Sequence, residues 1–420
     1  MDRRSLLAGS SLLGLATALG PGAWKAALAG GPAQDGVGPY GPMTADANGF
    51  LLPAGFTSRV VAVSGQPVGQ SGYLWHAAPD GAATFASDDG GWFHAVNSEL
   101  TPGGVGVLRY SAAGEVIDAY RVLDGTGNNC AGGATPWGTW LSCEENARGR
   151  VWECDVTTPG QGVEMVAMGT FNHEAVAVDP DRKRLYLTED LPTGHYYRFT
   201  PDAYPDLSSG TLEAAVLATS PALTGQAGKV TWIPVADPSI PSQLQTPQAA
   251  QFNGGEGIWY DSFQDGWMYF TTKGDNYVWA HNLATDEITP LYEGDGALTD
   301  VDNIVVAPSG DLFVAEDGGN LELVVIAADT REVAPFLRLE GAQDAGSEIT
   351  GPCFSPDGTR LYFSSQRGGA PGSLAAGQGV TYEVTGPFRQ ARVGTAAIGP
   401  LGVAQPLTAP PAARAGRMLY

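Results

Sequence analysis

The chain has 420 residues, among them 58 glycines and 30 prolines, and a formal net charge of −23. Hydrophobic residues make up 43% of it, which is enough for a substantial core and excludes a disordered chain. Phosphate backbones are bound by clusters of lysine and arginine, which are missing here, so the composition argues against nucleic acid as a partner. The length suits two or three domains, or one large all-β domain.

Residues 1–29 have the features of an export signal. Arg3 and Arg4 precede a mildly apolar run that ends at Leu19, and residues 27–29 offer a small-x-small cleavage site. Paired arginines before such a run are typical of a twin-arginine signal, which predicts recognition by the twin-arginine export machinery; a general secretory signal is the alternative. No later run is long enough to span a bilayer. We therefore expect an exported protein, periplasmic or extracellular.

After a Gly/Pro-rich lead-in at residues 30–53, short β-like runs recur between turn residues. Six of these runs resemble one another and begin at positions 91, 138, 184, 266, 310 and 360, so that all but one of the intervals are of similar length. A repeat of roughly 40 to 50 residues built from short strands is typical of propeller blades. Residues 54–420 are thus predicted to form one β-propeller of six blades, with seven as the alternative, and residues 200–250 fill the long interval as an insertion.

Residues 129–146 combine two kinds of metal ligand. Cys130 precedes a Gly-rich turn, and a buried-looking strand then leads to Glu144 and Glu145. A thiolate is a soft ligand for transition metals, whereas carboxylates are hard ligands for calcium, magnesium or iron. The pattern predicts a mixed metal site; the alternative is a buried thiol beside two solvated acids.

The other repeats carry polar residues at matching places, in pairs whose separation along the chain is nearly constant. The pairs are Cys130 with Glu144, Glu174 with Glu189, Glu256 with Thr272, Asp302 with Glu316, and Glu348 with Ser365. In an antiparallel hairpin the start of the first strand lies beside the end of the second. If the first strand is innermost in each blade, all these positions gather on one rim. So many carboxylates need protons or cations, because like charges repel at short range; acids on a solvated loop face are the alternative.

Other familiar sites are missing from the sequence: it has no phosphate-binding loop, dinucleotide fingerprint, GxSxG elbow or HExxH pair. His173 beside Glu174 is expected to pack rather than to bind a metal. Four cysteines allow three full disulfide pairings, and if Cys130 is a ligand at least one of the other three stays free.

Four motifs make the chain resemble the PhoX-type alkaline phosphatase family, and residues 40–56 also look like the family's start. The motifs are NCAGGATPWGTWLSCEEN, FNHEAVAVDP, VDNIVVAPSGDLFVAEDGG and SEITGPCFSPDGTRLYFSSQ. The resemblance implies a six-bladed propeller whose axial site holds iron and calcium. It implies that a cysteine bridges two ferric ions, that acidic side chains hold the irons and calciums, and that an oxo group of the cluster, not a side chain, takes part in phosphoester hydrolysis.

Carried over residue by residue, the resemblance assigns the bridging thiol to Cys130. It assigns the other iron and calcium ligands to Glu144, Glu145, Glu174, Glu256, Asp302 and Glu348. The chain departs from the family in two places: glycines 254 and 255 replace an Arg-Pro pair before Glu256, and Gln366-Arg367 begins a segment that reads Gln-His-Pro-Gly elsewhere. Lys273 and Arg367 are the cations at matching rim positions and are candidates to bind phosphate in place of the missing arginine, Arg367 as a bidentate fork and Lys273 as a point charge; ordinary solvated loop cations are the alternative.

Three functions are compatible with these features. The first is an exported, metal-dependent phosphatase that acts on small phosphomonoesters. The second is a calcium-dependent, lactonase-like hydrolase with one axial cation and no thiol ligand. The third is a non-catalytic propeller that binds calcium structurally.

Overall fold

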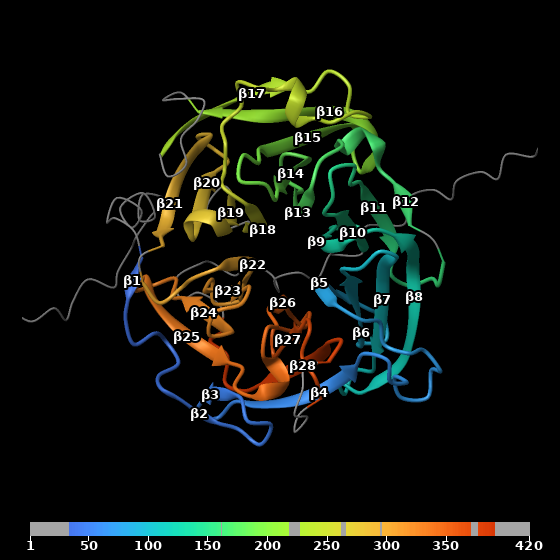
Figure 1. Ribbon diagram of the computed structural model, residues 1–420, viewed down its shortest axis with the longest axis vertical. Helices are drawn as coiled ribbons and strands as arrows, with labels where there is room; N and C mark the ends of the chain where they lie inside the picture. Colours follow the sequence, from blue (N-terminus) through green and yellow to red (C-terminus); the bar gives the residue numbers. More distant parts are fainter. Residues whose placement is uncertain are drawn as a thin grey trace, which may run out of the picture.

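The computed structural model describes residues 33–160, 162–217, 227–261, 266–294, 296–370 and 377–390. These residues form six antiparallel blades around a central axis, with the first strand of each blade innermost (Figure 1). Successive first strands contact one another around the ring, and the sixth contacts the first. The predicted all-β propeller with six blades is confirmed. The signal peptide predicted for residues 1–29 lies outside the described residues.

The six repeated runs of the sequence are the second strands of the six blades. The blades are β5–β8 (Pro79–Ala86, Trp92–Ser98, Gly103–Tyr110, Val116–Thr126), β9–β12 (Asn129–Ala134, Thr139–Glu144, Val151–Asp155, Val163–Glu164) and β13–β16 (His173–Asp179, Arg184–Glu189, Tyr196–Ala203, Asp206–Leu217). They continue with β18–β21 (Gly255–Asp261, Trp267–Thr272, Tyr277–Asn282, Glu287–Glu293), β22–β25 (Val301–Val306, Leu312–Glu316, Glu322–Ile326, Glu332–Arg338) and β26–β28 (Ile349–Phe354, Arg360–Ser365, Val380–Thr385).

The N-terminal part of the chain closes the ring. Strand β4 (Thr57–Val63) pairs with β28 and completes the sixth blade, so the two ends of the propeller are held together by backbone hydrogen bonds. The predicted lead-in lies on the outer edge of the fifth blade. There β3 (Leu51–Pro53) pairs with β25 and with β2 (Met43–Ala45), and β1 (Gln34–Asp35) runs parallel to β25.

The predicted insertion lies beside the third blade, and its first residues belong to the blade itself as β15 and β16. Beyond β16, strand β17 (Gly228–Pro234) pairs with β16 on one side and with β21 of the fourth blade on the other. This strand joins the two sheets at their outer edges (Figure 1).

The core consists of six hydrophobic clusters, each between two neighbouring blades. Trp140 and Tyr186, which the sequence places within the β runs, are about 1% exposed in these clusters, so they pack the blades. The remaining regular elements are single 3₁₀ turns. They are η1 (Val166–Met168), η2 (Gln243–Gln245), η3 (Lys273–Asp275) and η4 (Ala342–Asp344). None of the described helices has the length and apolar character that a membrane span requires.

Candidate metal centre

One backbone hydrogen bond repeats in all six blades and places the axial side chains. The residue after each second strand, here called the exit position, donates its N–H to the carbonyl of the residue before the first strand, the lead position. The exit positions are Glu99, Glu145, Asp190, Lys273, Asp317 and Gln366. The lead positions are Ala78, Asn128, Asn172, Gly254, Asp300 and Glu348. The nearly constant separation of the pairs in the sequence reflects this contact.

A second set of axial side chains stands two residues after each lead position, here called the bulge position. The first residue of each first strand pairs with the last residue of the second, and the register then shifts in every blade. Such bulges re-aim side chains at the ends of strands. The bulge positions are Asp80, Cys130, Glu174, Glu256, Asp302 and Thr350.

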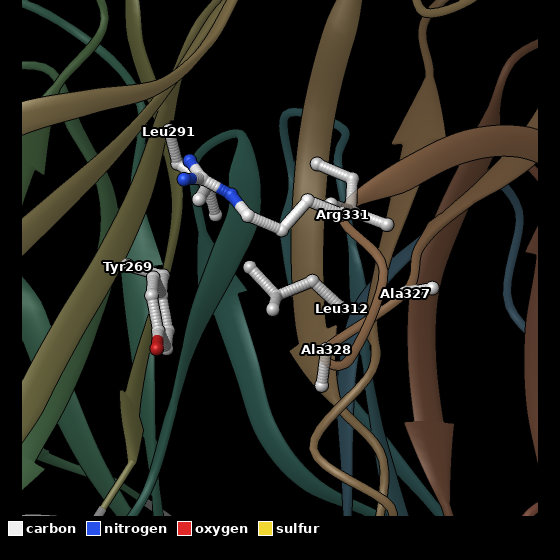
Figure 2. Close-up of a pocket in the computed structure, with 7 residues that line it drawn as sticks. Tyr269, Leu291, Leu312, Ala327, Ala328 and Arg331 are labelled. Carbon is white, nitrogen blue, oxygen red and sulfur yellow. The ribbon is translucent and has the colours of Figure 1, made fainter. Parts of the chain in front are cut away.

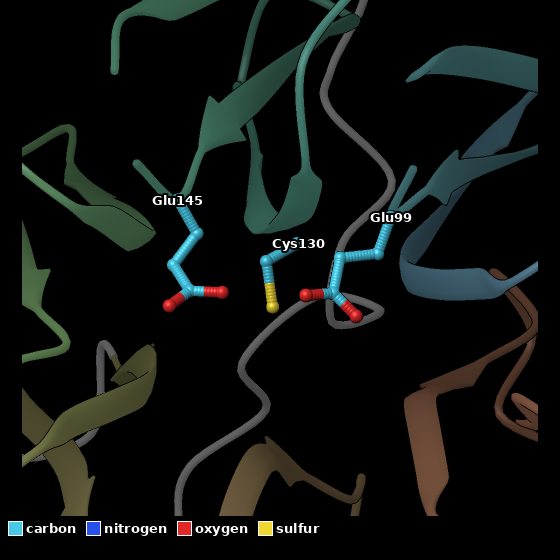
Figure 3. A group of neighbouring side chains, drawn as sticks. All are labelled: Glu99, Cys130 and Glu145. Carbon is cyan, nitrogen blue, oxygen red and sulfur yellow. The ribbon is translucent and has the colours of Figure 1, made fainter. Parts of the chain in front are cut away.

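Three groups of side chains from these positions meet closely enough to share a cation. They are Glu99, Cys130 and Glu145 (Figure 3); Asp80, Glu99 and Glu348; and Glu174, Glu256 and Asp302. Within each group the ligand atoms lie within 4.8 Å of one another. Glu99 belongs to two groups, and the thiol of Cys130 donates a 3.3 Å hydrogen bond to Oε1 of Glu174 in the third. All six blades therefore contribute to one connected site.

The site buries more negative charge than it can hold uncompensated. Glu174, Asp80 and Glu256 are at most 1% exposed. Burial, followed by the repulsion of neighbouring carboxylates, raises the pKa of Glu174 and Asp80 well above the usual range. Burial and the surrounding acids raise the pKa of the Cys130 thiol as well. These groups can ionise together only beside bound cations.

The donor set and its free oxygens fit metal ions. Among the described residues, Oδ1 of Asp80 and Oε2 of Glu174 are buried carboxylate oxygens that accept no hydrogen bond, so each has its lone pairs available for a ligand. The group that contains Cys130 offers sulfur and oxygen and suits a transition metal such as iron, whereas the two all-carboxylate groups suit hard cations such as calcium.

The structure separates the predicted ligands by the side of the strand on which they lie. Cys130, Glu145, Glu174, Glu256, Asp302 and Glu348, six of the residues proposed as ligands from the sequence, all belong to the three groups. Glu144 does not: its carboxylate accepts hydrogen bonds from the backbone N–H groups of Gly127 and Arg150, at 2.8 and 3.1 Å. Because successive residues of a strand face opposite sides, Glu144 points away where Glu145 points to the axis.

Glutamates at the position of Glu144 in the third and fifth blades also accept hydrogen bonds from backbone N–H groups. Glu189 accepts the N–H of His195 at 2.9 Å, and Glu316 accepts those of Thr299 and Glu322 at 3.0 and 3.1 Å. These glutamates hold the loops that follow the second strands. We expected both from the repeat spacing to share the rim with the proposed ligands, but their carboxylates bond to backbone N–H groups and belong to none of the three groups.

Two further members of the three groups were missed in the sequence. Asp80 and Glu99 occupy the bulge and exit positions of the first blade, which stand farther apart along the chain than the same two positions of any other blade. The signal that identifies them is the repeat at residues 91–96, because the exit position follows that run closely. Gln366, the exit residue of the sixth blade, donates its side-chain amide to Asp80 Oδ2 at 2.5 Å and to Glu99 Oε2 at 2.7 Å.

The two predicted cations lie at the site in different environments. The Lys273 ammonium lies 3.0 Å from Glu256 Oε1 and 3.0 Å from Asp317 Oδ2. Arg367 lies 3.1 Å from Glu348 Oε1, and half of its side chain is exposed. Arg367 therefore faces solvent at the edge of the site, whereas the side chain of Lys273 is 32% exposed and its ammonium lies between two carboxylates.

His173 and the other cysteines take no part in the site. His173 is fully buried, stacks on Phe171 with ring centroids 3.5 Å apart, and lies 3.3 Å from the carbonyl of Gly169. This confirms its predicted packing role. All four cysteines are buried free thiols, so none of the three possible disulfide pairings is formed.

A small apolar pocket lies away from the axis, between the fourth and fifth blades (Figure 2). Its lining consists of Tyr269, Leu291, Leu312, Ile326, Ala327, Ala328 and Arg331. It contains no carboxylate or thiol, so it offers no metal ligand and is separate from the axial site.

Fold and site together define a six-bladed β-propeller with a buried thiol and a ring of carboxylates on its axis. A family model described as alkaline phosphatase PhoX matches residues 101–158, 148–272 and 256–369. The chain belongs to the PhoX alkaline phosphatase family, and is thereby an alkaline phosphatase, a phosphomonoesterase. The resemblance drawn from the sequence motifs is confirmed.

Two solved structures that resemble the chain have low sequence identity to it. Pseudomonas fluorescens PhoX in complex with vanadate, a transition state analogue, has 17% identity and a TM-score of 0.67, and the match covers 84% of this chain and 98% of that one. A gluconolactonase from Xanthomonas campestris has 13% identity and a TM-score of 0.47, covering 85% of this chain and 98% of that one. A search of curated proteins gave no significant match.

Proposed function

We propose that this chain is an exported phosphatase that hydrolyses small phosphomonoesters at a cluster of iron and calcium on the propeller axis. The observation that carries the proposal is the position of Cys130: a buried thiol among carboxylates from several blades, where it can ionise only beside cations. Membership of the PhoX family supports the phosphomonoester substrate class.

The side chains divide naturally between two kinds of ion. Cys130, with Glu99 and Glu145, would hold iron, because a thiolate favours transition metals. The all-carboxylate groups would hold calcium, and Glu174 touches both kinds of group through its contact with Cys130. When bound, such cations polarise phosphoryl oxygens and activate an oxygen nucleophile.

Positive charge for the substrate is proposed to come from Arg367. A phosphate dianion near carboxylates needs cationic partners, and a guanidinium binds two phosphate oxygens at once. Half-exposed Arg367 can turn from Glu348 toward a phosphate that enters from solvent. Lys273 adds charge from within the site while its ammonium stays between Glu256 and Asp317. The family's arginine before Glu256 has no counterpart, because Gly254 stands there in a left-handed conformation with φ +71°.

The test compares the wild type with the variants Cys130→Ser and Cys143→Ser. Both variants replace a buried thiol, but only Cys130 lies in the site, so Cys143→Ser is the matched control. We expect iron and calcium in the wild type, iron lost only in Cys130→Ser, and hydrolysis of an aryl phosphate abolished by a calcium chelator. Hydrolysis that survives exhaustive chelation contradicts the proposal. Calcium alone, unchanged in Cys130→Ser, supports the lactonase-like alternative, and a filled cluster that turns over no ester supports the non-catalytic one.

A further inference from the structure

The fourth blade places a positive charge at its exit position. At this position blades one, two, three and five have carboxylates and the sixth has a glutamine amide, all with the same backbone hydrogen bond to the lead position. The fourth blade has Lys273. An ammonium has three donors and no lone pair, so it cannot bind a metal ion.

The Lys273 ammonium lies where two blades bring their carboxylates together. It is 3.0 Å from Oε1 of Glu256 in its own blade and 3.0 Å from Oδ2 of Asp317 in the fifth. The ammonium thus brings a positive charge to the place where the carboxylates of the two blades meet.

We propose that the Lys273 ammonium replaces a divalent cation between Glu256 and Asp317, so that this place is neutralised by the chain itself, beside the calcium that Glu174, Glu256 and Asp302 would hold. The inference rests on the proposed function, because it assumes that the remaining carboxylates bind cations. Its consequence is that the site holds fewer ions than its carboxylates would otherwise require.

Charge and distance support this assignment. On the opposite side, Glu99 at its exit position joins two ligand groups, and within the described part of the chain no lysine or arginine forms an ion pair with it. A divalent cation placed between Glu256 and Asp317 would lie close to the Lys273 ammonium and be repelled by it. The two positive charges are thus alternatives for one place.

The experiment measures bound calcium in wild type, Lys273→Met and Lys273→Asp. The first variant removes the charge at similar length, and the second introduces the residue that blades three and five carry at this position. Arg367→Met is the matched control, because it removes a cation that is half exposed and contacts the carboxylate of Glu348 at the solvent edge. Each protein is dialysed against calcium chloride, desalted and subjected to elemental analysis, with circular dichroism to verify folding.

We expect both Lys273 variants to bind about one more calcium per chain than the wild type, and Arg367→Met to show no gain. In chelator the Lys273 variants should unfold at a lower temperature than the wild type, and calcium should restore them. Equal calcium in folded wild type and both variants overturns the inference, as does failure of both variants to fold in calcium. A wild type without iron and calcium overturns the proposed function instead.

Discussion

The side-chain amide of Asn97, in the first blade, donates hydrogen bonds to the backbone carbonyls of Cys130 and Ala131 in the second, at 2.9 and 2.7 Å. Its oxygen accepts from Trp140 Nε1 and Ser142 Oγ, at 2.8 and 2.9 Å. Asn97 thereby fixes the backbone that carries the thiol. Thr188 and Thr271 make the corresponding bond to the carbonyls of Glu256 and Asp302.

Asn97→Ala should therefore reduce both stability and iron content. It removes two hydrogen bonds to buried carbonyls and two from buried donors, and one unsatisfied buried group costs about 1–3 kcal/mol. Urea unfolding and elemental analysis measure the two effects. Asn48→Ala is the control, because the side-chain amide of Asn48, on the lead-in, donates its hydrogen bonds to Ser58 of β4, outside the axial site. Unchanged iron in a folded Asn97→Ala variant would show that the thiol does not depend on this support.

Substitution of the adjacent residues Glu144 and Glu145 by glutamine should affect metal content differently. Glu145→Gln removes a ligand carboxylate, so we expect loss of bound metal and of phosphatase activity. Glu144→Gln keeps one oxygen for the N–H groups of Gly127 and Arg150, so we expect metal content to stay and stability to fall by roughly 1–2 kcal/mol. Elemental analysis of both variants decides, and metal loss in Glu144→Gln would contradict the assignment.

This pair shows what the sequence can and cannot predict. The repeat spacing predicts the second strands and the rim on which they end, because blade geometry fixes the distance between the two chain positions. It does not predict which of two consecutive acids faces the axis, because a one-residue change in register exchanges the two faces. Asp80 escapes the pattern for a related reason: the hairpin of the first blade is longer than the others, so its separation from Glu99 falls outside the repeated interval.

The roles of some residues depend on three-dimensional contacts that the spacing of residues along the sequence does not predict. Lys273 looks like a phosphate ligand in the sequence, yet its charge is taken up by Glu256 and by Asp317 of the next blade. That inter-blade contact is formed only when the fourth and fifth blades pack against each other. The glutamine at position 366 likewise gains its role from Asp80, at the other end of the propeller's sequence.

From the burial of His94 we predict how the free energy of unfolding depends on pH. Burial lowers the pKa of His94 to about 3, well below its usual value near 6.5. The unfolded chain then binds more protons than the folded one below pH 6.5, so the contribution of neutral His94 to stability is lost as the pH falls from about 6.5 toward 3. His94→Phe preserves the contact with Tyr362, whose ring centroid is 4.8 Å away. We expect the unfolding free energy of this variant, measured with urea, to fall less than that of the wild type as the pH is lowered from about 6.5 to 4. An equal fall in both proteins would contradict the role given to His94.

The predicted export signal is tested independently of the metal site. Replacement of Arg3 and Arg4 by lysines keeps the charge of residues 1–29 but removes the paired arginines that the twin-arginine machinery recognises. We expect the variant to accumulate in the cytoplasm, as judged by fractionation. Unchanged export would support a general secretory signal instead.

Removal of metal should reverse the sign of the stability change that Glu174→Gln causes. Glu174 is fully buried, one of its oxygens accepts no hydrogen bond, and its ligand group contains two further buried acids, Glu256 and Asp302. In chelator, burial and the neighbouring carboxyl groups disfavour the charged form of Glu174, so folding requires proton uptake there. Glu174→Gln needs no proton and should therefore stabilise the protein by roughly 1–3 kcal/mol. With calcium and iron bound the same variant lacks a ligand and should be less stable than the wild type. Urea unfolding in both conditions measures the two values. Destabilisation of equal size in both would mean that the carboxylate of Glu174 supports the fold through packing alone and has no cation to hold.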